Sequence, residues 1–137
     1  MSSSVEITLI QDAEPEAIFR LYQLAGWVTP EDGDGWIPAM LRGSWAAAGA
    51  FADGQLIGFA RIISDGVSDG YVQDVVVDPA WRRQGIAGKL VKTLTEHARE
   101  SGIGWLGLIG VPGTESLYRS CGFEVLESHI PMRWDPR

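Results

Sequence analysis

Residues 71–101, YVQDVVVDPAWRRQGIAGKLVKTLTEHARES, decide the fold that this sequence predicts. Tyr71–Val77 is rich in aromatic and β-branched residues and stops just before Pro79, which has no N–H to donate, so we expect a buried strand there. From Ile86 to Ala98 the apolar residues recur at helical spacing, and Gly102 supplies a stop signal. The stretch therefore predicts a strand, a short basic turn and an amphipathic helix.

The turn between that strand and that helix has the chemistry of a phosphate site. The start of a helix leaves about four backbone N–H groups without partners and carries a partial positive charge. Two glycines keep side chains away from that backbone, and two arginines add donors that stay charged. We expect a pyrophosphate to bind this cofactor turn, which consists of Arg82, Arg83, Gln84, Gly85, Ile86, Ala87, Gly88 and Lys89.

Two common phosphate-binding patterns do not fit the cofactor turn. A P-loop requires a glycine five residues before Gly88 and a Ser or Thr after Lys89, where the chain has Arg83 and Leu90. Only Gly85 and Gly88 fit the spacing of a G-x-G-x-x-G fingerprint. The pattern that fits is R-x-x-G-x-A at Arg82, Gly85 and Ala87, directly after a strand that ends in Val-Asp-Pro. It resembles the acetyl-CoA-binding motif of the GNAT superfamily of N-acetyltransferases; the alternative is an ordinary strand–helix joint with exposed arginines.

A second motif lies further along the chain. Tyr118, Gly122 and Phe123 form Y-x-x-x-G-F at the place where GNAT enzymes carry it. With both motifs in the right order, nearly the whole chain resembles a GNAT domain, and we expect residues 1–137 to form one such domain. The resemblance implies an α/β (α+β) GNAT fold with a mixed central sheet of about six to seven strands and about four helices. Its first half would be antiparallel, and its central and fifth strands would be a parallel pair.

The remaining segments supply the other elements of such a fold. A tight turn at Asp53-Gly54 makes the strands on either side of it antiparallel neighbours, and the βαβ order makes Ile103–Ile109 parallel to Tyr71–Val77. The other expected elements are strands at Val5–Ile10, Ala48–Ala52 and Gln55–Ile63, a helix from Asp12 to Ala25, short helices within Trp36–Ala47 and from Thr114 to Cys121, and last strands at Phe123–Glu127 and Ile130–Trp134.

Composition and charge limit the fold class, the cellular location and the kinds of molecule that the chain is expected to bind. With 137 residues, 45% hydrophobic and 21% charged, the chain suits one globular domain that needs neither a disulfide nor a metal to fold. A single cysteine favours a cytoplasmic location, and we find no secretion signal or membrane span. The net charge of −7 argues against nucleic acid or a membrane as partner and favours a cationic substrate. A homodimer is left open, with the last strands and six tryptophans as apolar surface for one.

The GNAT resemblance implies direct transfer of an acetyl group from acetyl-CoA to a primary amine through a tetrahedral intermediate. It places the main chain of Val75, Val76 and Val77 beside the pantetheine and thioester, and Tyr118 beside the sulfur as general acid. A phenol pKa of about 10 keeps that hydroxyl protonated at neutral pH. The alternative for Tyr118 is a core tyrosine in an amphipathic helix.

Asp74 is the candidate general base. It is the only carboxylate inside the central strand, and strict alternation places it on one face with Val72 and Val76. Three roles stay open: it deprotonates the ammonium through water, it positions the ammonium, or it only bonds to a loop. Gln73 is a poorer candidate because an amide does not take up a proton at neutral pH.

The loop between the first two helices is the candidate acceptor site. Aromatic walls and carboxylates select an ammonium group, whereas the alternative is a solvated turn with its tryptophans packed in the core. The residues in question are Trp27, Glu31, Asp32, Asp34 and Trp36.

The other reactive side chains are expected to be uninvolved. His97 and His129 are interpreted as solvated and Cys121 as a small buried residue, and without HExxH or CxxC we expect no metal site. The favoured function is an acetyl-CoA-dependent N-acetyltransferase acting on a cationic small-molecule or peptide amine. A non-catalytic acyl-CoA-binding or regulatory module is the rival, and another acyl donor is a third reading.

Overall fold

The computed structural model describes residues 4–137, which are built around a five-stranded sheet in the order β1-β2-β3-β4-β5. Residues 1–3, on which the expected lack of a secretion signal partly rests, lie outside this range. The elements are β1 (Val5–Ile10), α1 (Pro15–Leu24), η1 (Pro30–Asp32), α2 (Ile37–Gly43), β2 (Ala46–Ala52), β3 (Gln55–Ser64), β4 (Asp69–Val77), η2 (Pro79–Trp81), α3 (Ile86–Glu100), β5 (Trp105–Gly107) and α4 (Glu115–Ser120).

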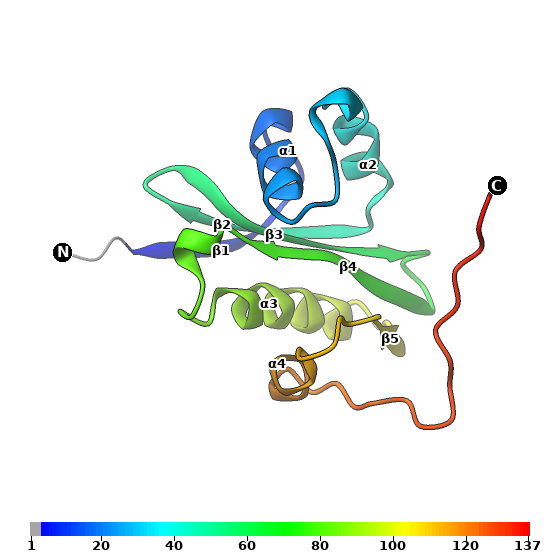
Figure 1. Cartoon of the computed structure of the whole chain (residues 1–137). Helices are drawn as coiled ribbons and strands as arrows, with labels where there is room; N and C mark the ends of the chain where they lie inside the picture. Colours follow the sequence, from blue (N-terminus) through cyan, green and yellow to red (C-terminus); the bar gives the residue numbers. More distant parts are fainter. Residues whose placement is uncertain (1–3) are drawn as a thin grey trace.

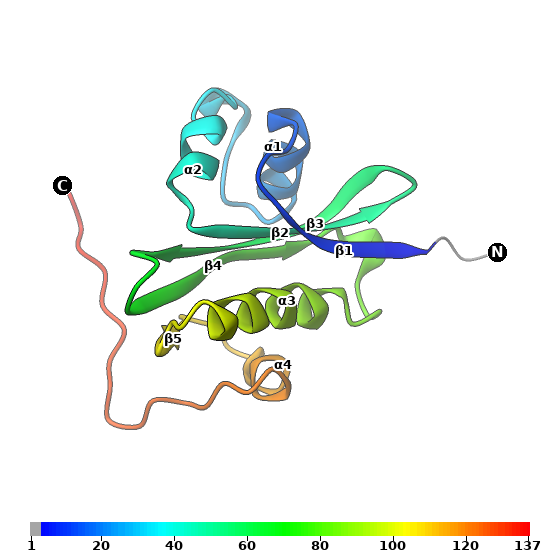
Figure 2. The same ribbon diagram turned by 180° about the vertical axis from the view of Figure 1, so that it is seen from behind.

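Helices cover both faces of the sheet. α1 and α2 lie on one face and α3 on the other, with α4 packed beyond α3 (Figure 1), and the view from behind shows the same layers (Figure 2). Leu90 and Leu94 of α3 are fully buried against the sheet. Gly58 of β3 permits this close approach, because a Cβ there would lie 3.1 Å from Leu90 Cδ1. The amphipathic helix predicted from Ile86 onward is therefore the one that covers the central strands.

The antiparallel half of the sheet confirms the hairpin prediction. β1 pairs with β2, β2 with β3 and β3 with β4, all antiparallel. Asp53 and Gly54 have φ angles of 50° and 78°. Two successive residues at positive φ are what a two-residue turn of type I′ needs, and this turn has the twist that matches a hairpin.

A bulge in β4 overturns the predicted alternation of side chains. β3 advances two residues between Phe59 and Arg61 while β4 uses three to run between their partners, Val76 and Gln73. The extra residue is Asp74, whose φ of 58° lies in the left-handed region. Val72 consequently packs in the core with α3, whereas Val76 packs in the core with α1 and α2. The prediction that Val72, Asp74 and Val76 share one face is wrong, because one inserted residue exchanges the two faces beyond it.

The sheet ends sooner than expected. β5 pairs parallel with Asp69–Tyr71 of β4, as predicted, but covers only Trp105–Gly107 instead of Ile103–Ile109. No residue from 108 to 137 belongs to a strand, so the predicted pair Phe123–Glu127 and Ile130–Trp134 is not formed and the sheet has five strands rather than six to seven. A strand requires a hydrogen-bonded neighbour, and the last segment instead runs in the open past the end of the sheet (Figure 1).

His97 corrects a second expectation. Its ring is half-buried and stacks on Trp45, with 4.9 Å between ring centroids and 24° between planes. The indole comes from the residue just before β2, so this contact ties the C-terminal half of α3 to the sheet. In the same range of residues, 4–137, no helix has the length and apolar character to cross a bilayer.

Asp78, directly after β4, is a buried carboxylate that anchors the way into the cofactor turn. Its Oδ2 accepts a 2.6 Å bond from Arg20 of α1, and its Oδ1 accepts a 2.9 Å bond from the Ala80 N–H. Burial by itself would raise the pKa of Asp78, but the Ala80 amide and the guanidiniums of Arg20 and Arg82 together hold that pKa below its ordinary value. The carboxylate is thus charged and paired at neutral pH.

Asp78→Asn is expected to lower the free energy of unfolding at pH 7 by about 2 kcal/mol, the scale of a hydrogen bond to a charged group. Because the pKa is lower in the folded state, the stabilisation is complete above the unfolded pKa of about 4 and is lost as the pH falls below it. Urea unfolding at pH 7 and at about pH 3 measures the loss in free energy of unfolding and its dependence on pH. The exposed pair Asp135–Arg137, of similar length at 2.7 Å, is the control: Asp135→Asn should change stability little, and an equal loss would contradict the role of burial.

Candidate active site

The cofactor turn is open to solvent and has an unusual backbone. Arg82, Arg83, Gln84 and Gly85 are exposed, and Arg83 and Gly85 have positive φ angles of 64° and 74°. A left-handed conformation at an arginine is costly, and such strain is found most often at functional positions. Gly85 is the N-cap of α3, and a Cβ built on it would meet no atom within 4 Å. The space in front of the helix start is therefore free for a ligand.

The first turn of α3 fits an anionic group. The Lys89 N–H is the first to bond within the helix, to the Gly85 carbonyl at 3.1 Å, and the amides of Ile86, Ala87 and Gly88 have no intrahelical acceptor. They point out of the positive end of the helix dipole, and no side-chain cap covers them. Arginines precede these amides and Lys89 follows them, so the turn presents donors and positive charge together.

The last part of β4, which leads into the turn, pairs with β3 on one side but not with β5 on the other. β4 and β5 pair only over Asp69–Tyr71 and Trp105–Gly107. Past that point Val76 and Val77 pair with β3 on one side, and β5 no longer pairs with β4 on the other. The bulge at Asp74 lies where the two strands part. Backbone groups of Val75–Val77 that face away from β3 are thus not paired with β5, and their contact with the pantetheine and thioester stays a prediction.

Tyr118 lies on α4, which packs against α3. A Cβ on Gly88 would lie 3.6 Å from Leu117 Cδ1, and the Cys121 thiol points at the Gly88 carbonyl, 3.6 Å away, so α4 packs on the first turn of α3. Tyr118 is half-buried, with its ring edge-on to Phe123 at 6.1 Å. Burial, with a smaller effect of Cys121, raises the pKa of the Tyr118 phenol. Its hydroxyl is therefore a proton donor over the whole neutral range.

An open hollow of about 1040 Å³ lies beside Tyr118. Its walls are β5 and the loop that follows it, α4, the end of α3 and the first part of the C-terminal segment. Gly110 in that loop is in close contact with α4, since a Cβ there would lie 2.8 Å from Thr114 Oγ1 and 3.3 Å from the Tyr118 ring. Tyr118 thus lines this hollow, and the helix that carries it packs on the first turn of α3.

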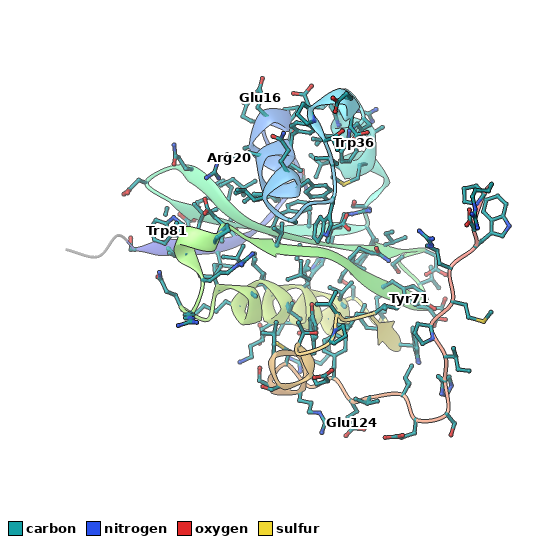
Figure 3. The ribbon with its side chains drawn as sticks, in the orientation of Figure 1. Glu16, Arg20, Trp36, Tyr71, Trp81 and Glu124 are labelled. Carbon is teal, nitrogen blue, oxygen red and sulfur yellow. The ribbon has the colours of Figure 1, made fainter. Side chains whose placement is uncertain are left out.

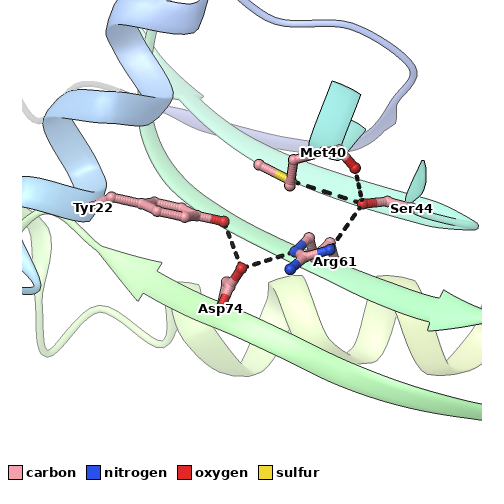
Figure 4. Close-up of polar contacts among 5 residues, drawn as sticks. All are labelled: Tyr22, Met40, Ser44, Arg61 and Asp74. Carbon is pink, nitrogen blue, oxygen red and sulfur yellow. Dashed lines mark hydrogen bonds and ion pairs between the residues drawn. The ribbon is translucent and has the colours of Figure 1, made fainter. Parts of the chain in front are cut away.

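Asp74 is held in a polar network on the other face of the sheet (Figure 4). Its Oδ2 accepts bonds from the Tyr22 hydroxyl at 2.7 Å and from Arg61 Nε at 2.8 Å. Arg61 also donates to Ser44 Oγ at 3.3 Å. Burial and the neighbouring Asp74 raise the pKa of Tyr22 well above its ordinary value, so Tyr22 is a permanent donor to the carboxylate. Asp74 is therefore bonded to α1 and β3, and its role as a base stays a prediction.

The predicted acceptor loop packs against this network. Trp27 and Trp36 both lie on the Tyr22 ring, at centroid distances of 5.2 and 5.7 Å. Trp36, labelled in Figure 3, also donates its indole N–H to the Gly33 carbonyl at 2.8 Å. The tryptophans thus have a packing role, and the loop they flank is brought close to Asp74.

The three acids of that loop differ in their surroundings. Asp32 accepts the Thr29 N–H at 2.7 Å and closes a capping box around η1, so its carboxylate already has a structural partner. Glu31 is exposed and Asp34 is half-buried. Their selection of a cationic acceptor stays a prediction.

Two residues of the network, Tyr22 and Arg61, were not among the candidates from sequence. Arg61 had a recognisable signal, because it is the only charge in a strand that reads QLIGFARIIS, and a lone charge on a buried strand requires a partner. Tyr22 had no recognisable signal in the sequence, since it falls on the apolar stripe of α1 like any core aromatic residue. In residues 4–137, no three His, Cys, Asp or Glu side chains are grouped to hold a metal ion.

Comparison with known proteins identifies the family of this chain. The model of the acetyltransferase (GNAT) family matches residues 11–123. The chain belongs to the GNAT acetyltransferase family. Members transfer acetyl groups from acetyl-CoA to small-molecule or protein amines. The chain is 33% identical over 84 residues to GCN5-related N-acetyltransferase 2, chloroplastic, of Arabidopsis thaliana; the match covers 61% of this chain and 33% of that protein, so this GNAT chain spans about a third of its relative.

Solved structures show the same GNAT fold over the whole chain. A GNAT family acetyltransferase from Streptococcus pneumoniae TIGR4 is 26% identical, with a TM-score of 0.78 over 98% of this chain and 99% of the other. An aminoglycoside N-acetyltransferase in complex with CoA has a TM-score of 0.73 at 22% identity, over 98% and 97% of the two chains. The predicted GNAT fold, with an antiparallel half and a parallel β4–β5 pair, is confirmed.

Proposed function

We propose that this chain is an acetyl-CoA-dependent N-acetyltransferase that acylates a primary amine directly. The observation that carries the proposal is the packing of α4, the helix that carries Tyr118, on the first turn of α3, which suits a pyrophosphate. A separate anion site and a separate tyrosine would each have an ordinary explanation. Packing of the helix that carries the tyrosine on the helix that begins at the anion site suits a phosphate-anchored thioester enzyme.

Each part of the site has a task in this reaction. Acetyl-CoA supplies an activated acyl group as a thioester. The amides of Ile86–Gly88, with Arg82, Arg83, Gln84 and Lys89, bind the pyrophosphate, and the main chain of Val75–Val77 orients the pantetheine and the thioester carbonyl. Tyr118 donates its proton to the sulfur as the thiolate departs, and its raised pKa keeps that proton in place until then.

The acceptor amine must lose a proton before it attacks, because an alkylammonium has a pKa of about 10.4. We propose that it arrives from the side of Trp27, Glu31, Asp34 and Trp36. Asp74 orients it through a water molecule, which takes up the proton and passes it to solvent. The ion pair between Asp74 and Arg61 supports orientation over proton abstraction, because a carboxylate that already accepts two bonds gains less by taking a proton. The net charge of −7 supports a cationic acceptor.

Acetyl-CoA consumption over a panel of amines tests the proposal. The panel contains a polyamine, an aminoglycoside, an arylalkylamine and peptides with a free N-terminus or lysine, together with an alcohol of matched shape for one of them. We expect turnover with at least one cationic amine and none with its alcohol. If acetyl-CoA binds but no amine is acetylated, the chain is an acyl-CoA-binding module; if acetyl-CoA does not bind, the cofactor assignment is wrong.

A further inference from the structure

Arg61 is a charged residue in the middle of a buried strand, and its guanidinium is only partly used. Its Nε donates to Asp74 Oδ2 at 2.8 Å and its Nη1 donates to Ser44 Oγ at 3.3 Å, as Figure 4 shows. No group in residues 4–137 accepts a bond from Nη2. Because Nε and Nη2 share one edge of the planar guanidinium, Nη2 lies beside the carboxylate. Arg61 thus has one donor more than its pairing with Asp74 needs.

Asp74 has an unused oxygen in the same way. The Tyr22 hydroxyl, at 2.7 Å, and Arg61 both bond to Oδ2, whereas Oδ1 accepts no bond from the described part of the chain. Every fully buried side-chain nitrogen or oxygen in residues 4–137 has a hydrogen-bond partner, so Asp74 Oδ1 and Arg61 Nη2 are both reached from outside. The two side chains are 23% and 16% exposed. The network therefore presents an acceptor and a donor close together.

This pair of atoms lies beside the position proposed for the thioester. Asp74 directly precedes Val75–Val77, and the bulge that contains it lies where β4 parts from β5. An amine bonded to Oδ1 is therefore next to the main chain that is proposed to orient the acyl group. Since Asp74 and Arg61 contact each other through Oδ2 and Nε, one small ligand can reach both of the remaining atoms.

A simple alkylamine matches only half of this arrangement. Its ammonium can donate to Asp74 Oδ1, but it offers nothing to Arg61 and is repelled by that positive charge. Covering the guanidinium without giving it an acceptor also costs the hydrogen bond that it makes to water. An acceptor with a carbonyl oxygen on the carbon next to its amine satisfies both groups, because the amine faces the carboxylate while the oxygen faces the guanidinium.

The ease of losing a proton favours the same class of acceptor. An α-amino group has a pKa of about 8, against about 10.4 for an alkylamine, so at pH 7 roughly a tenth of it is already the free base, compared with about one part in 2,500. Asp74 is a poor proton acceptor, because two bonds already hold its charged form. A site with such a carboxylate suits an amine that needs little help in deprotonation.

Resting on the proposed function, we infer that the acceptor is an α-amino carbonyl compound, as an amino acid or the first residue of a peptide is. Its amine is oriented from Asp74 Oδ1 and its carbonyl oxygen accepts from Arg61 Nη2. Arg61 is then the residue that distinguishes these acceptors from other amines. The bond changes are those of the proposed function: the α-nitrogen bonds to the acetyl carbon, the carbon–sulfur bond breaks, and Tyr118 protonates the thiolate.

Calorimetric titration at pH 6, with and without saturating coenzyme A, tests this inference without turnover. Alaninamide, leucinamide and argininamide are each compared with the amine that lacks the carbonyl group: ethylamine, isoamylamine and agmatine. At pH 6 both members of a pair are ammonium ions, so the difference in pKa does not bias the comparison. We expect the amide of at least one pair to bind about tenfold more tightly or better, the scale of a hydrogen bond to a charged group.

Arg61→Lys should bring the two affinities of that pair to within about threefold, because a lysine keeps the charge beside Asp74 and lacks the second nitrogen on the guanidinium edge. Arg42→Lys, the same change at an exposed position of α2, is the control and should keep the preference. Urea unfolding shows whether both variants fold, and the wild-type comparison needs no variant. Leucine and the peptide Leu-Gly-Gly, set against leucinamide, distinguish a free amino acid from a peptide N-terminus.

The outcomes separate this inference from the proposed function. Equal affinities within every pair, or no binding of any amide, would overturn the inference even if an alkylamine is acetylated. A preference that survives Arg61→Lys would assign the carbonyl contact to another residue. Preferred binding of amides without any acetylation would instead support the inference and contradict the proposed function.

Discussion

Tyr118→Phe is expected to lower kcat by about 10²-fold and to leave the dissociation constant of acetyl-CoA unchanged, the lower range for loss of a general acid. The substitution removes one hydroxyl, and the ring keeps its edge-on contact with Phe123. Burial raises the pKa of this phenol, so the wild-type enzyme should retain its acid above pH 10, where an ordinary tyrosine ionises. Steady-state kinetics on the best amine, calorimetry with acetyl-CoA and a pH profile of kcat measure the three quantities.

Tyr71→Phe is the matched control for this experiment. Tyr71 lies on β4, where its ring packs edge-on to Trp105 at 5.3 Å, and it has no part in the proposed proton transfer. Its variant should keep kcat. A wild-type kcat in Tyr118→Phe would show that the leaving thiolate needs no acid, and a similar fall in both variants would point to a general effect of the hydroxyls on packing.

Gly85→Ala is expected to weaken acetyl-CoA binding by about 10²-fold. The new methyl group meets no protein atom, so the chain still folds, but it stands in front of the amides that are proposed to bind the pyrophosphate. Losing even one hydrogen bond to a charged group costs about 1.5–3 kcal/mol, which is tenfold or more in affinity. Calorimetric titration with acetyl-CoA gives the affinity, and urea unfolding gives the stability of the same sample.

Gly102→Ala separates the effect on the ligand from the strain in the backbone. Gly102 follows the other end of α3, has a φ of 83° and also has no atom within 4 Å of an added Cβ. Both variants pay the same left-handed penalty of about 1–2 kcal/mol in stability. Only Gly85→Ala should lose affinity; equal affinities in the two variants would refute the pyrophosphate assignment.

The strand, turn and helix of residues 69–100 were predictable because their signals are local. Period-two and period-3.6 patterns, a proline that ends the strand and a glycine at the helix start all lie within a few residues of the feature they specify. The β2–β3 hairpin was predictable for the same reason, since Asp53-Gly54 determines its own turn.

The features that sequence reasoning missed depend on neighbours far away in the chain. The bulge at Asp74 is set by how β4 pairs with β3, and a strand of valines reads equally well with or without it. The last two strands were predicted from their own composition, but strand formation needs a partner that one chain does not place beside them. His97 looked solvated on a helical wheel because the wheel shows nothing of Trp45.

In the candidate site too, local motifs could be recognised in the sequence, whereas contacts between distant segments could not. The cofactor turn and Tyr118 were proposed from motifs, and the structure packs α4 on the first turn of α3. The partners of Asp74 were not found, because Tyr22 and Arg61 lie 52 and 13 residues from it in the chain. Motifs reveal which groups are present, whereas bonds between distant segments decide what those groups are free to do.

The inserted residue at position 74 determines which of the two cores each later side chain of β4 faces. With Asp74 in place, Val72 faces one hydrophobic core and Val76 faces the other. A chain one residue shorter there would send every side chain from 75 to 77 to the wrong core and straighten the strand against its neighbour. A deletion at this position should therefore exchange the two faces, whereas a substitution keeps the count of residues and loses only the bonds that Asp74 accepts from Tyr22 and Arg61.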